Sequence, residues 1–318
     1  MTVMERLARS VVVPVVVLEK VEDAVPLAKA MAAGGVDTME ITFRTACAPE
    51  CIKAVAENCP DVLVGAGTIL NLDQCKLAIE MGAKFIVSPG FSDEIVGYCV
   101  EHGVAVAPGC VTPTEIMAAM KHGLKMVKFF PANVYGGLKA LKNLAAPFGT
   151  MKFLPTGGVN ADNVGEFIAA PFIHAVGGSW VCPKADIAAG NWDKITQLCA
   201  EARRTALGFE VAHVGINMPD AEAALGLGKE LGNAFGFNVK DGNSSVFAST
   251  GIEIMKSMYL GTNGHIAVRT NSIPLAIAAL EKKGYAILPE TAKFKNGRMI
   301  AVYLAGEFGG FAIHLLQK

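Results

Sequence analysis

Short apolar runs alternate with segments of helical spacing along the first two thirds of the chain. Near-continuous apolar strands, each followed by a helix, are typical of a parallel sheet covered on its outer side. The predicted strands are 11–18, 38–43, 63–68, 85–89, 104–108, 126–130, 152–155 and 174–179. The predicted helices are 21–33, 48–58, 71–81, 93–101, 112–122 and 161–168. Eight such units predict an α/β fold, a (β/α)8 barrel, and about 205 residues is at the small end for it.

The pattern changes after Arg203 and Arg204, and all eight cysteines lie at or before Cys199. We therefore predict two domains, 1–206 and 207–318. The second domain repeats itself at a spacing of about 50 residues, which indicates a duplicated unit. Its predicted strands are 212–217, 245–248, 252–256, 264–269, 299–304 and 311–316, with helices at 220–231 and 273–283. Each half reads strand–helix–strand–strand–strand, so the expectation is a smaller α+β domain of paired βαβββ modules.

Lys128 is the most informative residue of the predicted barrel. It stands near the end of an apolar strand, with Phe129, Phe130 and Pro131 after it. In such barrels the chemistry gathers at the carboxyl ends of the strands. Burial disfavours a charged amine, and a neutral amine adds to carbonyl carbons to form Schiff bases. The alternative is a lysine whose charge reaches solvent along its apolar stem.

Glycine-rich loops follow the seventh and eighth predicted strands. Gly157-Gly158 and Gly178-Ser179 stand where barrels of this kind present backbone N–H groups to a phosphate. Each glycine pair taken alone is also an ordinary turn signal. We favour the phosphate interpretation because both loops occur together.

Composition excludes several classes of function. Charged residues are 18% of the chain and the formal net charge is −1, so neither nucleic acid nor an anionic membrane is an expected partner. The longest apolar run, 11–18, is too short to span a bilayer, and the first residues lack the pattern of a secretory signal. The scattered cysteines contain no CxxC pair and indicate reduced thiols. We expect a cytoplasmic protein.

The spaced motifs of the first 205 residues resemble the 2-keto-3-deoxy-6-phosphogluconate (KDPG) and 4-hydroxy-2-oxoglutarate (KHG) aldolase family. The motifs that carry the resemblance are 40–45, 65–68, 88–90, 128–132, 155–158 and 177–180. The resemblance implies a class I aldolase that needs no cofactor, forms a homotrimer and yields pyruvate from a keto acid. The same opening at the carboxyl ends of the barrel strands would accommodate both KDPG and 4-hydroxy-2-oxoglutarate, so the sequence does not choose between these substrates. Departures at Phe43 and 133–135 bear on substrate preference.

The groups available suggest a mechanism. Lys128 would form an iminium ion with the C2 ketone, and that ion accepts the electrons of the breaking C3–C4 bond. Glu40 is the one carboxylate of the strand-end loops placed to move the protons, directly or through a water. The resemblance puts Arg44 on the substrate carboxylate. It also puts Thr68 and Thr156 on the pyruvoyl and hydroxyl groups, with Pro89 and Phe130 as walls that exclude water. Glu40 and Arg44 could also form an internal salt bridge.

The second domain resembles the glyoxalase, bleomycin-resistance and extradiol dioxygenase superfamily, also called vicinal oxygen chelate, over about residues 210–318. Matched by position, its candidate metal ligands are His213, Glu253, His265 and His314, the last where relatives most often have Glu. Such a set could hold a divalent Zn, Ni, Mn or Fe ion. The alternative is a degenerate copy without metal. The domain is then either a metal-dependent isomerase or lyase, or a non-catalytic module for metabolite binding or assembly.

Overall fold

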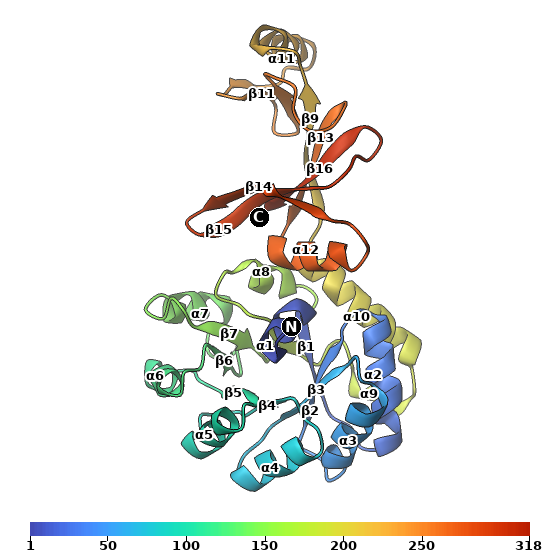
Figure 1. Ribbon diagram of the computed structural model, residues 1–318, viewed down its shortest axis with the longest axis vertical. Coiled ribbons are helices and arrows are strands. Elements are labelled where there is room, and N and C mark those ends of the chain that lie inside the picture. Colours follow the sequence, from blue (N-terminus) through green and yellow to red (C-terminus); the bar gives the residue numbers. More distant parts are fainter. The chain divides into compact units, whose positions relative to one another are not determined.

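The computed structural model describes all residues, 1–318, and divides them into two compact units, residues 1–206 and residues 207–318. The first unit contains eight short strands surrounded by helices (Figure 1). No helix of the structure combines the length and the apolar character needed to cross a membrane.

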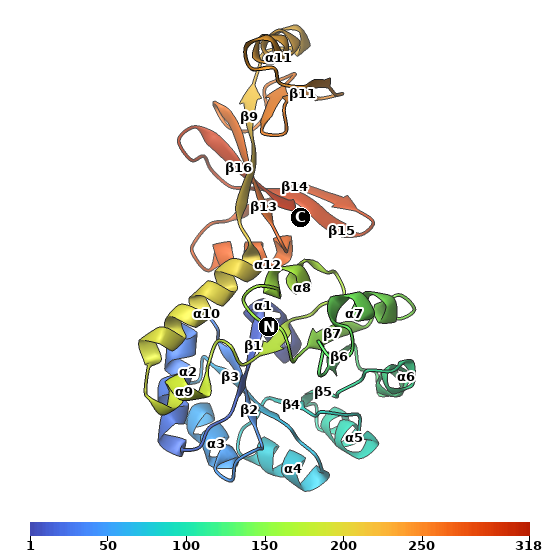
Figure 2. The same cartoon turned by 180° about the vertical axis from the view of Figure 1, so that it is seen from behind.

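The eight strands of the first unit are all parallel. They are β1 (Val12–Val16), β2 (Thr38–Thr42), β3 (Leu63–Gly67), β4 (Phe85–Val87), β5 (Ala105–Ala107), β6 (Met126–Phe129), β7 (Lys152–Pro155) and β8 (Val176–Gly178). Six of them form one sheet in the order β5-β4-β3-β2-β1-β8, and β6 pairs with β7. Parallel bridges from Gly109 to Lys128 and from Thr156 to Gly177 join the two sheets at both sides. The strands thus form a TIM-like α/β unit, which Figure 2 shows from behind.

Helices alternate with these strands and cover their outer side. They are η1 (Val21–Asp23), α2 (Ala24–Ala33), α3 (Ala48–Asn58), α4 (Leu72–Glu80), α5 (Asp93–Glu101), α6 (Pro113–Lys121), α7 (Gly137–Ala145), α8 (Val164–Ala169), α9 (Lys184–Ala188) and α10 (Trp192–Leu207). Local sequence sets several of their starts. The Thr112 hydroxyl accepts from the backbone N–H of Glu115, and the Glu115 carboxylate accepts from the N–H of Thr112 in return.

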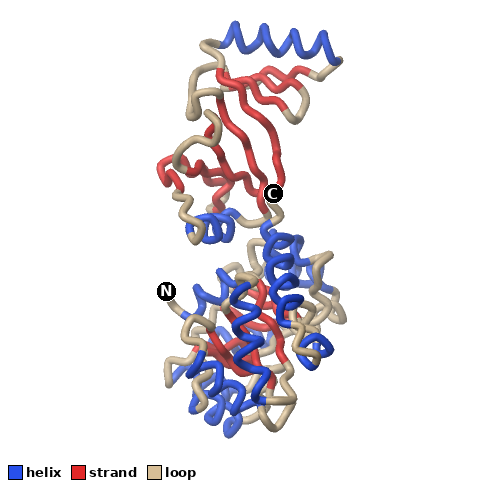
Figure 3. Tube along the Cα trace, turned by 90° about the vertical axis from the view of Figure 1, so that its right-hand side faces the viewer, coloured by secondary structure: helices blue, strands red, loops and turns tan.

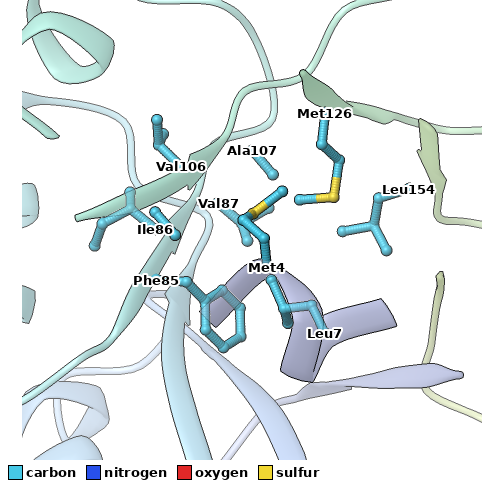
Figure 4. A pocket seen from close by; sticks show the side chains of 10 residues that line it. Met4, Leu7, Phe85, Ile86, Val87, Val106, Ala107, Met126 and Leu154 are labelled. Carbon is cyan, nitrogen blue, oxygen red and sulfur yellow. The ribbon is translucent and has the colours of Figure 1, made fainter. Parts of the chain in front are cut away.

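Helix α1 (Val3–Ser10) closes the amino-terminal end of the barrel. Met4 and Leu7 of α1 point toward Val87, Met126 and Leu154 (Figure 4). Leu7 is 2% exposed and belongs to an apolar cluster built largely from residues near the starts of the strands. Apolar side chains of α1 therefore cover the starts of these strands from the inside of the barrel.

The second unit is one eight-stranded sheet made of two βαβββ modules. The first module is β9 (Glu210–Asn217), α11 (Ala221–Phe235), β10 (Val239–Asp241), β11 (Ser245–Ala248) and β12 (Ile252–Met255). The second is β13 (Gly264–Thr270), α12 (Ile273–Glu281), β14 (Ile287–Lys295), β15 (Arg298–Leu304) and β16 (Phe311–Gln317). The order β10-β11-β12-β9-β13-β16-β15-β14 places the same elements symmetrically about an antiparallel β9–β13 seam.

The two modules bury their helices against alternate residues of the strands. Ala224 of α11 packs with Val246, Ala248 and Ile254, and Figure 3 shows the long helix α11 along one side of the strands. Residues of α12 pack in the same way with Val302 and Leu315. Because successive strand side chains point to opposite faces, the side chains directly before and after these residues on β12, β15 and β16 lie on the face without helices.

We expect the chain to be separable between residues 206 and 207. Leu207 is 6% exposed within the apolar cluster of the second unit, and its carbonyl accepts from the Thr270 hydroxyl (2.7 Å) and the Asn271 N–H (2.9 Å). Fragments 1–206 and 207–318 should each unfold in a single thermal transition, followed by circular dichroism. A fragment 209–318, which lacks Leu207, should lose about 2–5 kcal/mol of stability. Equal stability of fragments 207–318 and 209–318 would place the boundary elsewhere.

Candidate functional sites

Lys128 and Glu40 form a buried ion pair inside the barrel. Lys128 stands on β6 and Glu40 on β2, and their Nζ and Oε1 atoms are 3.1 Å apart. Lys128 is 5% exposed and Glu40 is fully buried. The Lys128 Nζ also lies 5.4 Å from the centroid of the Phe130 ring. The amine is thus held by one carboxylate and one aromatic ring and is shielded from bulk water.

Glycines on neighbouring strands make room for these side chains. A Cβ atom on Gly67 of β3 would collide with the Glu40 carboxylate, and one on Gly177 of β8 would collide with the Thr156 hydroxyl. Glycine is therefore needed here for close approach to a side chain. The carboxyl end of the barrel keeps space only because these two positions carry no side chain.

One oxygen of Glu40 is left without a partner. Oε1 accepts from Lys128, whereas Oε2 is buried and makes no hydrogen bond. An unpaired buried carboxylate oxygen is costly. A hydroxyl group or a water molecule that donates a hydrogen bond to Oε2 would relieve that cost, so this oxygen is free to accept a hydrogen bond from a ligand.

Arg44 and Thr68 meet at the rim of the barrel. The exposed Arg44 donates from Nε to the Thr68 hydroxyl at 3.3 Å. Thr68 has φ +57°, a left-handed conformation that is rare for a residue with a branched Cβ and recurs at functional sites. The alternative of a Glu40–Arg44 salt bridge is wrong, because Glu40 pairs with Lys128 instead.

Backbone conformation and packing already require glycine at or just after the ends of β7 and β8. Gly157 and Gly158 both have φ +87°, and a Cβ on Gly158 would press against the Asn133 side chain. A Cβ on Gly178 would collide with the ring of Trp180. A side chain at Gly158 would disturb the loop whether or not a phosphate binds there.

The remaining predicted residues of the barrel lie around its mouth. Thr156 is buried, Phe130 is half-buried, and Pro89 and Ser179 are exposed. Pro89 therefore lies at the rim, where it can touch a ligand but does not by itself cover the amine.

The second unit brings its four predicted polar residues together. His213 on β9, His265 on β13 and His314 on β16 have ligand atoms within 4.8 Å of one another. The His213 Nε2 lies 3.2 Å from the His265 Nε2. The Glu253 Oε2 on β12 lies 3.0 Å from the first of these nitrogens and 3.2 Å from the second. All three histidines are buried.

Strand pairing explains this convergence. Gly215 lies opposite both Glu253 and His265, and Ala267 lies opposite both His213 and His314. Side chains two residues apart share a face, so all four polar residues stand on the face without helices. A Cβ on Gly215 would collide with the His265 ring.

The charges of this cluster depend on one another. Burial alone would raise the pKa of Glu253, but hydrogen bonds from His213, His265 and Ser245 outweigh it and hold that pKa well below its usual range. Burial, reinforced by the two neighbouring imidazoles, lowers the pKa of His314 to about 3. Glu253 is thus ionised and His314 neutral at pH 7, the forms in which both side chains bind metal ions.

Three residues around the cluster escaped the sequence analysis. The Ser245 hydroxyl donates to the other Glu253 oxygen at 2.6 Å, and the Tyr303 ring stacks on His314 with centroids 4.7 Å apart. Gly215 gives the His265 ring its space. Only strand register identifies these residues, although a glycine two residues after His213 was a visible signal. The His265 Nδ1 is buried and has no hydrogen-bond partner that could fix its ring. The Ser245 hydroxyl, by contrast, orients the Glu253 carboxylate by a hydrogen bond.

The first unit matches known aldolases. A family model described as KDPG and KHG aldolase matches residues 3–198. The 2-dehydro-3-deoxy-phosphogluconate aldolase of Treponema pallidum is 48% identical over 197 residues, which are 62% of this chain and 94% of that protein. The KHG/KDPG aldolase of Escherichia coli K12 is 44% identical over 60% of this chain and 90% of its own length.

Solved structures give the same result. A KDPG aldolase from Legionella pneumophila, with pyruvate captured as a covalent carbinolamine, superposes with a TM-score of 0.61 at 37% identity and covers 63% of this chain and 97% of its own. The KDPG aldolase of Zymomonas mobilis ZM4 with 3-phosphoglycerate gives 0.59 at 40% identity, over 63% and 94%.

Replacing Gly215 should disrupt the histidine cluster. In Gly215→Ala the new methyl group would displace the His265 ring, so we expect the second unit to lose about 1–3 kcal/mol of stability as overpacked sites do. Gly226→Ala is the matched control, because a Cβ there meets nothing and Gly226 lies within helix α11. That control should be neutral or more stable. Thermal unfolding of both variants measures the difference, and equal midpoints would contradict the packing argument.

Proposed function

The chain belongs to the KDPG and KHG aldolase family and is a class I aldolase, a carbon–carbon lyase, and we propose that Lys128 is its Schiff-base residue. The observation that carries this assignment is the buried Lys128–Glu40 pair near the carboxyl ends of β6 and β2. The carbinolamine of pyruvate in the Legionella pneumophila relative supports the same chemistry.

The proposed reaction uses the two paired groups in turn. Lys128 Nζ adds to the C2 ketone, and loss of water gives an iminium ion. The C4 hydroxyl then loses its proton to Glu40 while the C3–C4 bond breaks, and the electrons of that bond move into the iminium to leave an enamine. The aldehyde product leaves. Glu40 returns a proton to C3, and hydrolysis of the iminium releases pyruvate and the free amine. The partnerless Glu40 Oε2 is the acceptor best suited to this role.

The residues around the mouth would hold the substrate. We assign Arg44 to the substrate carboxylate, since a guanidinium can donate two parallel hydrogen bonds to it. Thr68 and Thr156 would contact the pyruvoyl and hydroxyl oxygens, and Pro89 and Phe130 the apolar edge. The backbone at Gly157, Gly158, Gly178 and Ser179 would receive the phosphate.

Both KDPG and 4-hydroxy-2-oxoglutarate are proposed substrates. The Treponema pallidum relative is named for the first and the Escherichia coli relative for both. We propose a homotrimer in the cytoplasm, from the family resemblance and from the eight cysteines, all free thiols.

Borohydride trapping tests the role of Lys128. Reduction in the presence of pyruvate should attach the three-carbon unit to Lys128, located by peptide mass spectrometry, and Lys128→Ala should abolish both trapping and cleavage. Lys142→Ala, which removes an exposed lysine of α7, is the control and should change neither. Glu40→Gln should still form the adduct but turn over about 100-fold more slowly or worse, as expected for a lost acid–base group. An adduct on another lysine would overturn the assignment.

For the second unit, we propose a glyoxalase-like domain that binds one divalent metal ion through His213, His265, His314 and Glu253. Its paired βαβββ modules and the position of each polar residue in its module support this resemblance. Metal–ligand bonds of about 2.0–2.1 Å keep neighbouring donors about 3.0–3.4 Å apart. The separations of 3.0–3.2 Å among His213, His265 and Glu253 fit that spacing. An ion bound there would polarise an oxygen ligand.

Metal analysis separates this proposal from that of a metal-free module. The purified full chain, loaded with Zn²⁺, Ni²⁺, Mn²⁺ or Fe²⁺ and freed of excess, should retain about one equivalent of its preferred ion. His213→Ala and His265→Ala should lose that ion, whereas His102→Ala, which removes an exposed histidine of the first unit, should keep it. Chelation should lower the unfolding midpoint of the second unit and leave aldol cleavage unchanged. Retention of no ion would leave the non-catalytic module as the function of this domain.

A further inference from the structure

A cavity opens beside the histidine cluster, entirely within the second unit. It has a volume of about 650 Å³, and its lining includes His213, Phe247, Lys240 and Arg269. This volume suits a metabolite rather than a single ion, because pockets for small organic ligands measure about 300–1,000 Å³. His213 belongs to both the cluster and the cavity, so a molecule in the cavity can contact one residue of the cluster.

The charged side chains of the cavity are both cationic. Lys240 makes no ion pair, and the adjacent Asp241 is paired with Lys256 at 2.6 Å. Arg269 faces Glu210 at 3.7 Å, but that carboxylate is also bound by Lys318 at 2.8 Å. Two cations therefore share Glu210, and no acidic residue lines the cavity. The charge balance favours an anion.

The rest of the lining indicates what else the ligand carries. Phe237 and Phe247 supply aromatic surface, and the Phe247 ring meets His213 edge-on with centroids 5.7 Å apart. Asn238, Ser249 and Thr250 supply amide and hydroxyl groups. A ligand with an apolar body and one anionic end would use both kinds of surface.

We propose that this cavity binds a small organic carboxylate, with its carboxylate neutralised by Lys240 and Arg269 and its apolar body against Phe237 and Phe247. The inference builds on the proposed role of the second unit as a binding domain, and it names the ligand class of that domain. It does not depend on the Schiff-base chemistry of the barrel. It also does not require the bound metal, since none of these four residues belongs to the proposed ligand set.

Matched charged and neutral probes test the proposal on the full chain. Calorimetric titration should give saturable binding of benzoate or 3-phenylpropanoate and at least about tenfold weaker binding of the corresponding amides. Neither carboxylate has a ketone that Lys128 could attack. Lys240→Met and Arg269→Gln should each weaken carboxylate binding about tenfold or more, as expected for a lost charged hydrogen bond. Lys229→Met, the same charge change on the exposed side of α11, should have no effect.

Three results would overturn the proposal: amides that bind as well as the carboxylates, equal affinities in the Lys240 and Lys229 variants, or no binding of either carboxylate up to its solubility limit. The metal content of the same samples and their aldol cleavage rate are measured in parallel. Loss of metal with intact carboxylate binding would count against the metal site alone. Absence of aldol cleavage in the unmodified full chain would count only against the assignment of the barrel as an aldolase.

Discussion

The buried Lys128–Glu40 ion pair constrains the rest of the barrel. Removing two charges from water costs several kcal/mol for each ion, and their attraction offsets that cost only when the geometry is good. Gly67 must lack a side chain so that the Glu40 carboxylate can approach. Helix α1 seals the opposite end with apolar side chains. Stability alone does not explain the pair, because an apolar pair of similar volume would often stabilise the barrel equally well.

Much of the fold was predictable because its strands are buried on both faces. Continuous apolar runs located all eight barrel strands, and helices α3 and α5 begin and end where the spacing predicted. Helices α1, α7, α9 and α10 and strands β10 and β14 escaped prediction. Helix α7 begins at Gly137, directly after Gly136; these glycines have φ of +58° and +92°, and such a glycine pair looks like a turn in the sequence. Strand β14 carries Pro289 and alternates little, because most of its residues are partly or fully exposed.

The sequence predicted those residues of the candidate sites whose residue type alone indicates a chemical role. Lysine at a strand end and histidine in matching positions of a repeat are visible in the sequence. The partners that set their properties are not, because they come from strand pairing. Ser245 contacts Glu253 from the adjacent strand, and Lys240 and Arg269 line one cavity although they are 29 positions apart in the sequence. Likewise, the pairing of Glu40 with Lys128 rather than Arg44 depends on barrel closure.

Both units bury polar side chains, and their folds do so in different ways. A barrel turns alternate side chains of every strand toward its axis, so it can bury one ion pair deeply and open a narrow mouth above it. A sheet with helices on one face leaves the other face for polar groups. Because the second unit consists of two similar modules, such groups occur at matching positions of both modules. In each unit the polar groups have unmet capacity: the Glu40 Oε2 in the first, and the His314 Nε2 in the second. Buried polar atoms without partners are rare in proteins. We therefore expect a ligand to complete both places. Gly67, on the strand next to β2, makes room for the Glu40 carboxylate, and Gly215, on the strand next to β13, makes room for the His265 ring beside His314.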